Sequence, residues 1–293
     1  MKVIITLPAY NEKKTIGRVI SDIKQAMDST KYNYRILVVD DGSNDGTGDI
    51  AKRSGAIVHS HPANYGLAET FKTEMRKCLE LGADIIVHTD ADGQYIAKDI
   101  PKLIKEVEDG NDLVLGSRFK GKIEYMPFIK RLGNRAFSKV VSKITKKKIS
   151  DSQTGFRAFT KEVAGSINII SSFTYTQEQI IKASRHKFKI KEVPIYFAKR
   201  DGKSKLMKNP FDFAVKAWIN LLRIYRDYEP LKFFCLIGGI FFLTGFTIGL
   251  WLLYIFTTTG VIGHVPSALL SVLLILIGIQ IFFFGFLADM NRK

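Results

Sequence analysis

The sequence predicts an α/β domain with a mostly parallel sheet flanked by helices, followed by a C-terminal hairpin of two transmembrane helices. Residues 1 to about 230 have a mixed, charged composition, and short runs of β-branched residues alternate there with helical patterns. Polar clusters follow these runs directly. From Phe233 onward almost every residue is apolar. Together these three observations predict one large domain with a membrane anchor.

The predicted sheet consists of continuous apolar runs rather than alternating ones. Strands that are buried on both faces and alternate with helices are typical of a parallel sheet. The N-terminal run ends at Pro8, which makes it too short for a signal peptide and favours a first strand. The predicted strands cover residues 3–7, 35–39, 56–59, 84–89 and 112–116, and the predicted helices between them include 14–27 and 67–81.

Every polar cluster of this region follows a predicted strand. In open α/β sheets, ligands bind beyond the carboxyl ends of the strands. The clusters therefore indicate one site at that edge of the sheet. They are residues 8–12, 40–45 and 90–94, together with Ser117 and Arg118.

Asp90 and Asp92 come directly after the buried run 84–89. Two carboxylates one residue apart can converge on a hard divalent cation, Mg²⁺ or Mn²⁺, that also binds a diphosphate. Gln94 supplies a neutral oxygen nearby. The alternative is a turn with solvated carboxylates, because Asp-x-Asp alone is a weak pattern. His59, His61 and His88 lack the spacing of metal ligands, and we expect them to be structural.

The C-terminal spans are predicted at residues 233–256 and 268–288. The first contains no charged residue, and each is long enough to cross a hydrocarbon core of about 30 Å. Basic residues flank both outer ends, at Lys232 and at residues 292–293, which places both ends and the domain on the cytoplasmic face. A buried hairpin of a soluble protein is the alternative, but little else in the chain is large enough to cover it. The predicted domains are 1–209, an interfacial helix at 210–231, and a hairpin at 232–290.

Two further segments, 127–149 and 211–228, combine apolar residues at helical spacing with many lysines and arginines. Such helices lie in the plane of an anionic membrane surface. The alternative is a pair of ordinary core-facing helices, but the nearby spans favour the membrane.

The net charge of +16 favours anionic partners such as lipid head groups, phosphates or nucleic acid. No nucleic-acid recognition motif is present, so lipid phosphate is the favoured explanation. The two cysteines, Cys78 and Cys235, do not form a disulfide framework, which suits a reducing compartment.

Taken in order, the motifs closely resemble the family 2 glycosyltransferases of GT-A fold. They are residues 7–12 (LPAYNE), 38–43 (VVDDGS), 64–68 (NYGLA), 90–94 (DADGQ) and 116–119 (GSRF). Two later motifs resemble the polyprenyl-phosphate branch, which holds dolichol-phosphate mannose synthase and dolichyl-phosphate glucosyltransferase. They are residues 151–159 (DSQTGFRAF) and 200–206 (RDGKSKL). The resemblance covers residues 1 to about 230.

The resemblance implies a membrane enzyme that transfers a hexose from a nucleotide-sugar to polyprenyl or dolichyl phosphate. It implies that a group of residues binds the donor, namely Pro8, Tyr10, Glu12, Asp41, Asp90, Arg200 and Lys205. Asp90, Asp92 and Gln94 would bind Mg²⁺ or Mn²⁺. Arg118 with Lys130 or Arg131, and Asn134, would bind the acceptor phosphate. UDP-hexose and GDP-mannose are both open as donors, and the oligomeric state is not predicted.

The acceptor predicts the mechanism. A phosphate monoester has its second pKa near 6 and is mostly ionised at neutral pH, so it needs no general base. We therefore expect direct displacement with inversion, in which Asp151 and Gln153 position groups rather than abstract a proton. A different lipid acceptor and a non-catalytic nucleotide-sugar-binding membrane scaffold are the alternatives.

Overall fold

The computed structural model describes residues 1–170, 175–199, 210–261 and 264–291. The chain forms two compact units, Met1–Ala217 and Trp218–Lys293. The division falls inside helix α8 (Pro210–Tyr228), close to the predicted start of the interfacial helix at residue 210. The domain limits at 209 and 231 stay a prediction.

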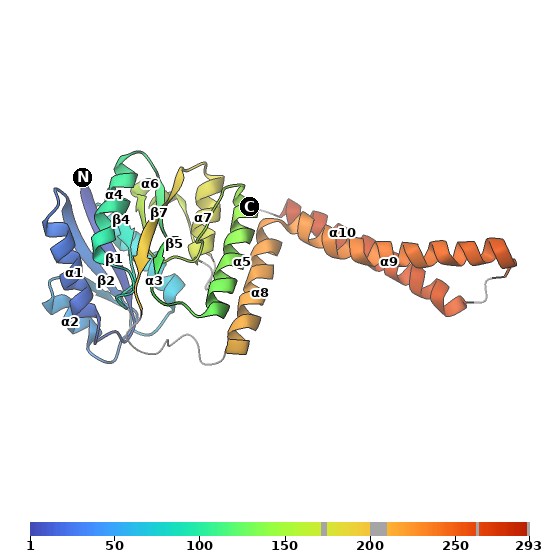
Figure 1. Cartoon of the computed structure of the whole chain (residues 1–293), viewed down its shortest axis with the longest axis horizontal. Helices are drawn as coiled ribbons and strands as arrows, with labels where there is room; N and C mark the ends of the chain where they lie inside the picture. Colours follow the sequence, from blue (N-terminus) through green and yellow to red (C-terminus); the bar gives the residue numbers. More distant parts are fainter. Residues whose placement is uncertain (171–174, 200–209, 262–263, 292–293) are drawn as a thin grey trace. The chain divides into compact units, whose positions relative to one another are not determined.

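The first unit is a seven-stranded sheet with helices on both sides (Figure 1). The strand order is β3-β2-β1-β4-β6-β5-β7. Strand β6 is antiparallel to both of its neighbours, and the other pairs are parallel. The strands are β1 (Lys2–Ala9), β2 (Asn33–Asp40), β3 (Ile57–Ser60), β4 (Ile85–His88), β5 (Leu113–Ile123), β6 (Arg157–Thr160) and β7 (Ile190–Phe197).

The predicted α/β class with a mostly parallel sheet is confirmed, and the five predicted strands are β1 to β5. Strands β6 and β7 were not predicted. Strand β6 is only four residues long and begins with the buried Arg157. Strand β7 contains Pro194, which weakens a strand pattern. Proline is nevertheless tolerated on an edge strand, and β7 is at the edge of the sheet.

The helices of the first unit connect the strands and cover the sheet. They are α1 (Ile16–Asp28), α2 (Thr47–Arg53), α3 (Leu67–Glu80), η1 (Ala97–Asp99), α4 (Ile100–Glu108), α5 (Phe128–Thr145), α6 (Lys161–Ser166) and α7 (Tyr175–Arg185). Alternate residues of β1, namely Val3, Ile5 and Leu7, join the core formed with α1 and α4. Period-two alternation sends the residues between them to the opposite face, where Thr6 bonds Glu74 of α3.

The second unit contains two long apolar helices, α9 (Pro230–Thr259) and α10 (Val265–Met290). Both are longer than the predicted spans, and both are long and apolar enough to cross a membrane. Large side chains on their outer surfaces are exposed, among them Leu236, Leu269 and Phe283. The buried residues of the two helices include four glycines, Ser271 and Leu252. This pattern is expected of a hairpin whose outer surface faces lipid.

Candidate active site

The predicted clusters meet at the carboxyl edge of the sheet. Ala9 at the end of β1 pairs with Asp40 at the end of β2, and Thr6 of β1 pairs with His88 of β4. The loops that follow these strands therefore start side by side. Residues 8–12, 40–45 and 90–94 share one end of the domain, as predicted. Ser117 and Arg118 were predicted to follow a strand at 112–116, but β5 continues to Ile123, so they lie inside the strand.

The loops after β1 and β2 are joined by Asn11. Its backbone amide donates to Ser43 Oγ at 2.9 Å, and its side-chain oxygen accepts from the amide of Asn44 at 3.0 Å. Asn11 has a φ of 54°, a left-handed conformation that asparagine tolerates better than most residues. Sequence reasoning missed this role, although an asparagine between Tyr10 and Glu12 at a strand end was the available signal.

Asp41 organises a third loop. Its Oδ1 accepts from His61 Nδ1 at 2.8 Å and from the amide of Tyr65 at 2.9 Å, and its Oδ2 accepts from the amide of Gly66 at 2.9 Å. The other ring nitrogen of His61 lies 3.0 Å from Thr73 Oγ1 on α3. Asp41 is buried, with both carboxylate oxygens bonded to protein. It therefore shapes this end of the sheet by holding residues 61–66.

The remaining predicted donor residues lie on the β1 side of this edge. Tyr10 is 40% exposed, so part of its ring lies at the surface of the domain. Glu12 Oε2 accepts from Thr15 Oγ1 at 3.2 Å at the start of α1. Pro8 is the buried penultimate residue of β1. Arg200 and Lys205 lie outside the described residues.

The Asp90 turn, residues 90–94, follows β4. Asp92 Oδ1 accepts from the amide of Gln94 at 3.0 Å, which closes the turn. The amide nitrogen of the Gln94 side chain donates to Ala198 O at 3.2 Å. The side-chain oxygen of Gln94 is therefore not directed at Ala198. A Cβ at Gly155 would lie 2.9 Å from Asp90 Oδ1, so a glycine there allows the carboxylate its position.

The chemistry of this turn fits a hard divalent cation. Asp90, Asp92 and Gln94 are half-buried and offer only oxygen donors, which Mg²⁺ and Mn²⁺ prefer. Among the residues that the structure describes, no group of three or more His, Cys, Asp or Glu side chains is arranged for a metal. A cation at this turn would thus need oxygens from a bound diphosphate or water to complete its coordination.

Arg118 and Asp151 form a buried, bidentate ion pair. Arg118 Nε and Nη2 donate to the two carboxylate oxygens of Asp151 at 2.7 and 2.8 Å, and the Arg118 amide adds a bond of 3.1 Å. The side chains are 4% and 0% exposed. Burial acts to lower the pKa of Arg118, but nearby Tyr95, Asp151 and Asp90 outweigh it and raise the pKa. The guanidinium is therefore charged at any working pH.

Helix α5 is bonded to the Asp151 segment, residues 150–155. Ser138 Oγ of α5 accepts from the amide of Ser152 at 2.9 Å. Asn134, one turn earlier, is buried, and Lys130 a further turn back is half-buried. Arg131 is exposed. The structure therefore places Lys130 and Asn134 on the helix face that is directed into the domain, whereas Arg131 is directed outward.

Tyr95 connects the Asp90 turn to the Asp151 segment. Its hydroxyl accepts from the amide of Gly155 at 3.0 Å, and its ring stacks on Phe156 at 5.2 Å. Burial raises the pKa of Tyr95 to about 12, so the hydroxyl keeps its proton. Gln153, a predicted positioning residue, lies half-buried between Asp151 and Gly155.

Arg157 also holds the Asp151 segment in place. It is fully buried, and its guanidinium donates to the backbone oxygens of Thr154 and Thr176 and to Gln179 Oε1. Burial lowers the pKa of Arg157. Neither Tyr95 nor Arg157 was predicted to contribute to the site. Arg157 stands inside the quoted motif 151–159, but its burial depends on α7, which the motif does not contain.

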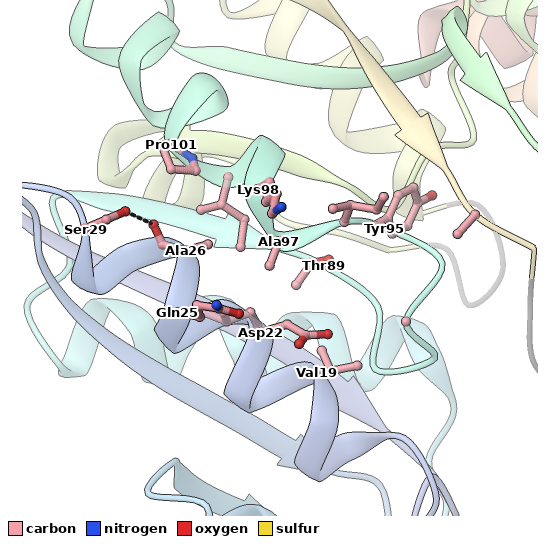
Figure 2. Close-up of a pocket in the computed structure, with 15 residues that line it drawn as sticks. Val19, Asp22, Gln25, Ala26, Ser29, Thr89, Tyr95, Ala97, Lys98 and Pro101 are labelled. Carbon is pink, nitrogen blue, oxygen red and sulfur yellow. Dashed lines mark hydrogen bonds between the residues drawn. The ribbon is translucent and has the colours of Figure 1, made fainter.

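A cavity of about 710 Å³ lies beside the Asp90 turn, between α1 and residues 93–101 (Figure 2). Thr89 and Gly93 contribute to its wall, and Asp22 and Gln25 of α1 face Ala97 and Lys98 across it. Asp90, Asp92 and Arg118 do not line it. The cavity is therefore separate from the predicted metal-binding and phosphate-binding residues.

Two family models match the chain. Residues 4–167 match glycosyl transferase family 2, and residues 219–292 match the glycosyltransferase family 2 C-terminal transmembrane region. The second match begins inside α8 and includes all of α9 and α10, so α9 and α10 form a membrane hairpin.

Curated relatives match either nearly the whole chain or about two thirds of it. The dolichol-phosphate mannosyltransferase of Pyrococcus furiosus is 31% identical over 93% of this chain and 78% of its own. The UDP-N-acetylglucosamine–dolichyl-phosphate N-acetylglucosaminyltransferase of Methanococcus voltae is 33% identical over 66% of this chain and 84% of its own.

The fold also has solved neighbours. Glucosyl-3-phosphoglycerate synthase from Mycobacterium tuberculosis superposes with a TM-score of 0.59 at 19% identity, covering 75% of this chain and 79% of that one. The predicted GT-A fold is confirmed by this likeness, which at such identity concerns the fold alone.

Proposed function

The chain belongs to glycosyltransferase family 2, and we propose that it transfers a hexose from a nucleoside-diphosphate sugar to polyprenyl or dolichyl phosphate. It is a glycosyltransferase with a membrane hairpin. Its relatives are named for transfer to dolichyl phosphate, but their names carry different sugars. The donor is therefore proposed only as a UDP-hexose or GDP-mannose.

The observation that carries the proposed acceptor is the buried Arg118–Asp151 pair. Arg118 uses Nε and Nη2 for Asp151, so Nη1 is the end of the fork that could bind an anion. Lys130 and Asn134 lie on the inward face of α5, whose Ser138 is bonded to the Asp151 segment. One guanidinium nitrogen together with a lysine and an amide suits a phosphate better than a neutral alcohol. We propose Lys130, rather than Arg131, as the lysine or arginine of α5 that binds this phosphate.

The proposed reaction needs no protein base. Both oxygens of Asp151 accept from Arg118, so this carboxylate is poorly placed to remove a proton. An ionised phosphate oxygen attacks the anomeric carbon, and the bond from that carbon to the diphosphate breaks, with inversion. A divalent cation at Asp92, with Asp90 and Gln94, would offset the charge of the departing diphosphate. Tyr10, Glu12, and the loops held by Asn11 and Asp41, would position the nucleotide.

The membrane side of the proposal rests on two surfaces. At the start of α5, Phe128, Ile129 and Leu132 are 78%, 49% and 60% exposed, beside the exposed Arg131 and Arg135. An exposed apolar patch rimmed by basic residues suits an anionic bilayer surface. On α8 the described Trp218, Ile219 and Leu222 are exposed as well.

The sidedness follows the positive-inside rule. Arg223, Arg226 and Lys232 precede the hairpin, and Arg292 and Lys293 follow it. We therefore propose that the catalytic domain lies on the cytoplasmic face.

The experiment that tests the function is transfer of labelled sugar into an organic-extractable lipid. Purified full-length protein is incubated with polyprenyl phosphate, Mg²⁺ or Mn²⁺, and UDP-glucose, UDP-galactose, UDP-N-acetylglucosamine or GDP-mannose in turn. We expect transfer from one donor, lost with chelator. If no donor supports transfer while a nucleotide-sugar still binds, the scaffold alternative is favoured.

The absence of a base is tested separately by Asp151→Asn. We expect lower activity, because the buried pair is broken, but a pH–rate profile of unchanged shape. Loss of one limb of the profile in the variant would contradict direct attack by an ionised phosphate.

A further inference from the structure

Glu192 of β7 is a buried carboxylate with an unusual number of bonds. Its side chain is 2% exposed. Its Oε1 accepts from the amide of Ser150 at 2.8 Å and from the amide of Asp151 at 3.0 Å, and Ser150 Oγ lies 3.0 Å from both carboxylate oxygens. Lys120 Nζ is 2.9 Å from Oε2. Burying a carboxylate is costly, and these charge-assisted bonds offset that cost.

These bonds converge on the residue that holds Arg118. The amide of Asp151 is fixed by Glu192, while its side chain is bonded at both oxygens to Arg118. Ser150 Oγ also lies 2.6 Å from Ser117 Oγ, the residue before Arg118. Asp151 is therefore held from two sides, by β7 through its backbone and by β5 through its side chain.

The sheet makes this arrangement rigid. Strands β5 and β7 are parallel neighbours in which Leu115 pairs with Glu192 and Gly116 with Val193. The carboxylate of Glu192 and the guanidinium of Arg118 thus come from adjacent strands, which are more rigid supports than loops.

We propose that Glu192 is a positioning residue for the acceptor phosphate, acting through Asp151 on Arg118 without touching substrate. This inference rests on the proposed function and deepens it. In the described part of the chain, the hydrogen bonds of Glu192 go to Ser150 and Asp151, and its ion pair is with Lys120. The loops 9–12 and 41–45 on the donor side are bonded to each other instead. Changing Glu192 should therefore affect the acceptor and spare the donor.

The test is a kinetic comparison of Glu192→Gln with a matched control, Glu106→Gln. Glu106 of α4 pairs at 2.9 Å with Lys191, the neighbour of Glu192 on β7, and that lysine is 50% exposed, as Lys120 is 47% exposed. Each variant removes one carboxylate charge, in β7 or paired with it, and leaves the size of the side chain unchanged. Full-length enzyme is assayed in detergent with polyprenyl phosphate and the nucleotide-sugar that supports transfer.

For Glu192→Gln we expect the KM for polyprenyl phosphate to rise about tenfold, the cost of one weakened charge-assisted contact, while the donor KM changes less than about twofold. Glu106→Gln should leave both within about twofold. Ser150→Ala removes the hydroxyl that bridges Glu192 and Ser117 and should raise the acceptor KM about threefold. If Glu192→Gln does not fold, the acceptor KM of Ser150→Ala still tests the inference, and an unchanged value would overturn it.

The outcomes separate the inference from the function. If wild-type enzyme transfers no sugar to polyprenyl phosphate, the proposed function fails. If wild type is active but Glu192→Gln behaves as Glu106→Gln does, or raises the donor and acceptor KM equally, the positioning role of Glu192 is overturned. A selective rise in the acceptor KM supports it.

Discussion

The two units of this chain bury opposite kinds of residue. At the carboxyl edge of the sheet, the catalytic unit buries charged groups that are distant in sequence, such as Arg118, Asp151 and Glu192. The hairpin buries residues without charge at intervals of seven. These are Gly238, Gly245 and Leu252 on α9, and Ser271, Gly278 and Gly285 on α10.

The contact between the hairpin helices depends on the absence of side chains. A Cβ at Gly278 would lie 2.8 Å from Gly238 O, and one at Gly245 would lie 2.7 Å from Ser271 O. Ser271 Oγ donates to Gly245 O at 2.7 Å. Small residues that let backbones approach are typical of helix pairs in membranes, and a seven-residue repeat gives a left-handed crossing.

The hairpin and the carboxyl edge of the sheet should therefore respond differently to substitution. The hairpin repeats one local pattern, so a change in it should alter packing and leave the chemistry intact. The candidate site at the carboxyl edge depends on single groups that only the sheet brings together, so a conservative change there should alter activity more than it alters the fold.

The sharpest contrast comes from Asp92→Asn. Asparagine retains an oxygen that can accept from the amide of Gln94, so the turn is preserved. The lost charge should reduce sugar transfer by about 10³-fold, the order seen when one electrostatic stabiliser of a transition state is removed. The measurements are kcat and thermal unfolding. A variant with nearly full activity would contradict the role of the Asp90 turn.

Arg118→Lys should have the next largest effect. Lysine keeps the charge but not the fork that bonds both oxygens of Asp151. We expect kcat/KM for polyprenyl phosphate to fall about 10²-fold, because two charge-assisted bonds and the guanidinium geometry are lost. Arg135→Lys is the control, since Arg135 is exposed and stacks on Phe119 at 5.6 Å. Equal effects of the two changes would show that charge alone matters.

Gly278→Ala tests the other side of the comparison. Its Cβ would meet Gly238 O, so the hairpin should lose about 1–3 kcal/mol of stability. Gly239→Ala is the matched control, because a Cβ there meets nothing within 4 Å. Thermal unfolding in detergent should separate the two variants, while their kcat values stay close to wild type. A large loss of kcat in Gly278→Ala would show that the hairpin contributes to the chemistry.

Phe128→Ser should have the smallest effect on folding, within about 0.5 kcal/mol, because this side chain is 78% exposed. If the patch meets the bilayer, the KM for long-chain polyprenyl phosphate in vesicles should rise a few-fold, whereas a short, water-soluble acceptor should be unaffected. Equal effects on both acceptors would argue against an interfacial role for α5.

The sequence predicted best what is local. The runs that become β1 to β5 and the Asp90 turn needed only neighbouring residues, and so did the two spans. Glu192 and Arg157 escaped prediction because they belong to β7 and β6, whose places in the sheet are set by pairing with β5 and β4. Asp41 was predicted to bind the donor, yet its bonds to residues 61–66 depend on a loop two elements away. Lys130 and Arg131 are adjacent in sequence, and our proposal of Lys130 rests on the burial that α5 gives each of them: Lys130 is half-buried and Arg131 is exposed.

We propose above all that the buried Arg118 binds the phosphate of the lipid acceptor. Its most direct test compares transfer of labelled sugar to polyprenyl phosphate and to the corresponding polyprenol, under the same donor and cation, by wild-type enzyme and Arg118→Lys. The account predicts transfer to the phosphate alone by wild type, and a strong loss of that transfer in the variant. Equal transfer to the neutral polyprenol would contradict it, since an alcohol would need the protein base that Asp151, bonded at both oxygens to Arg118, is poorly placed to supply.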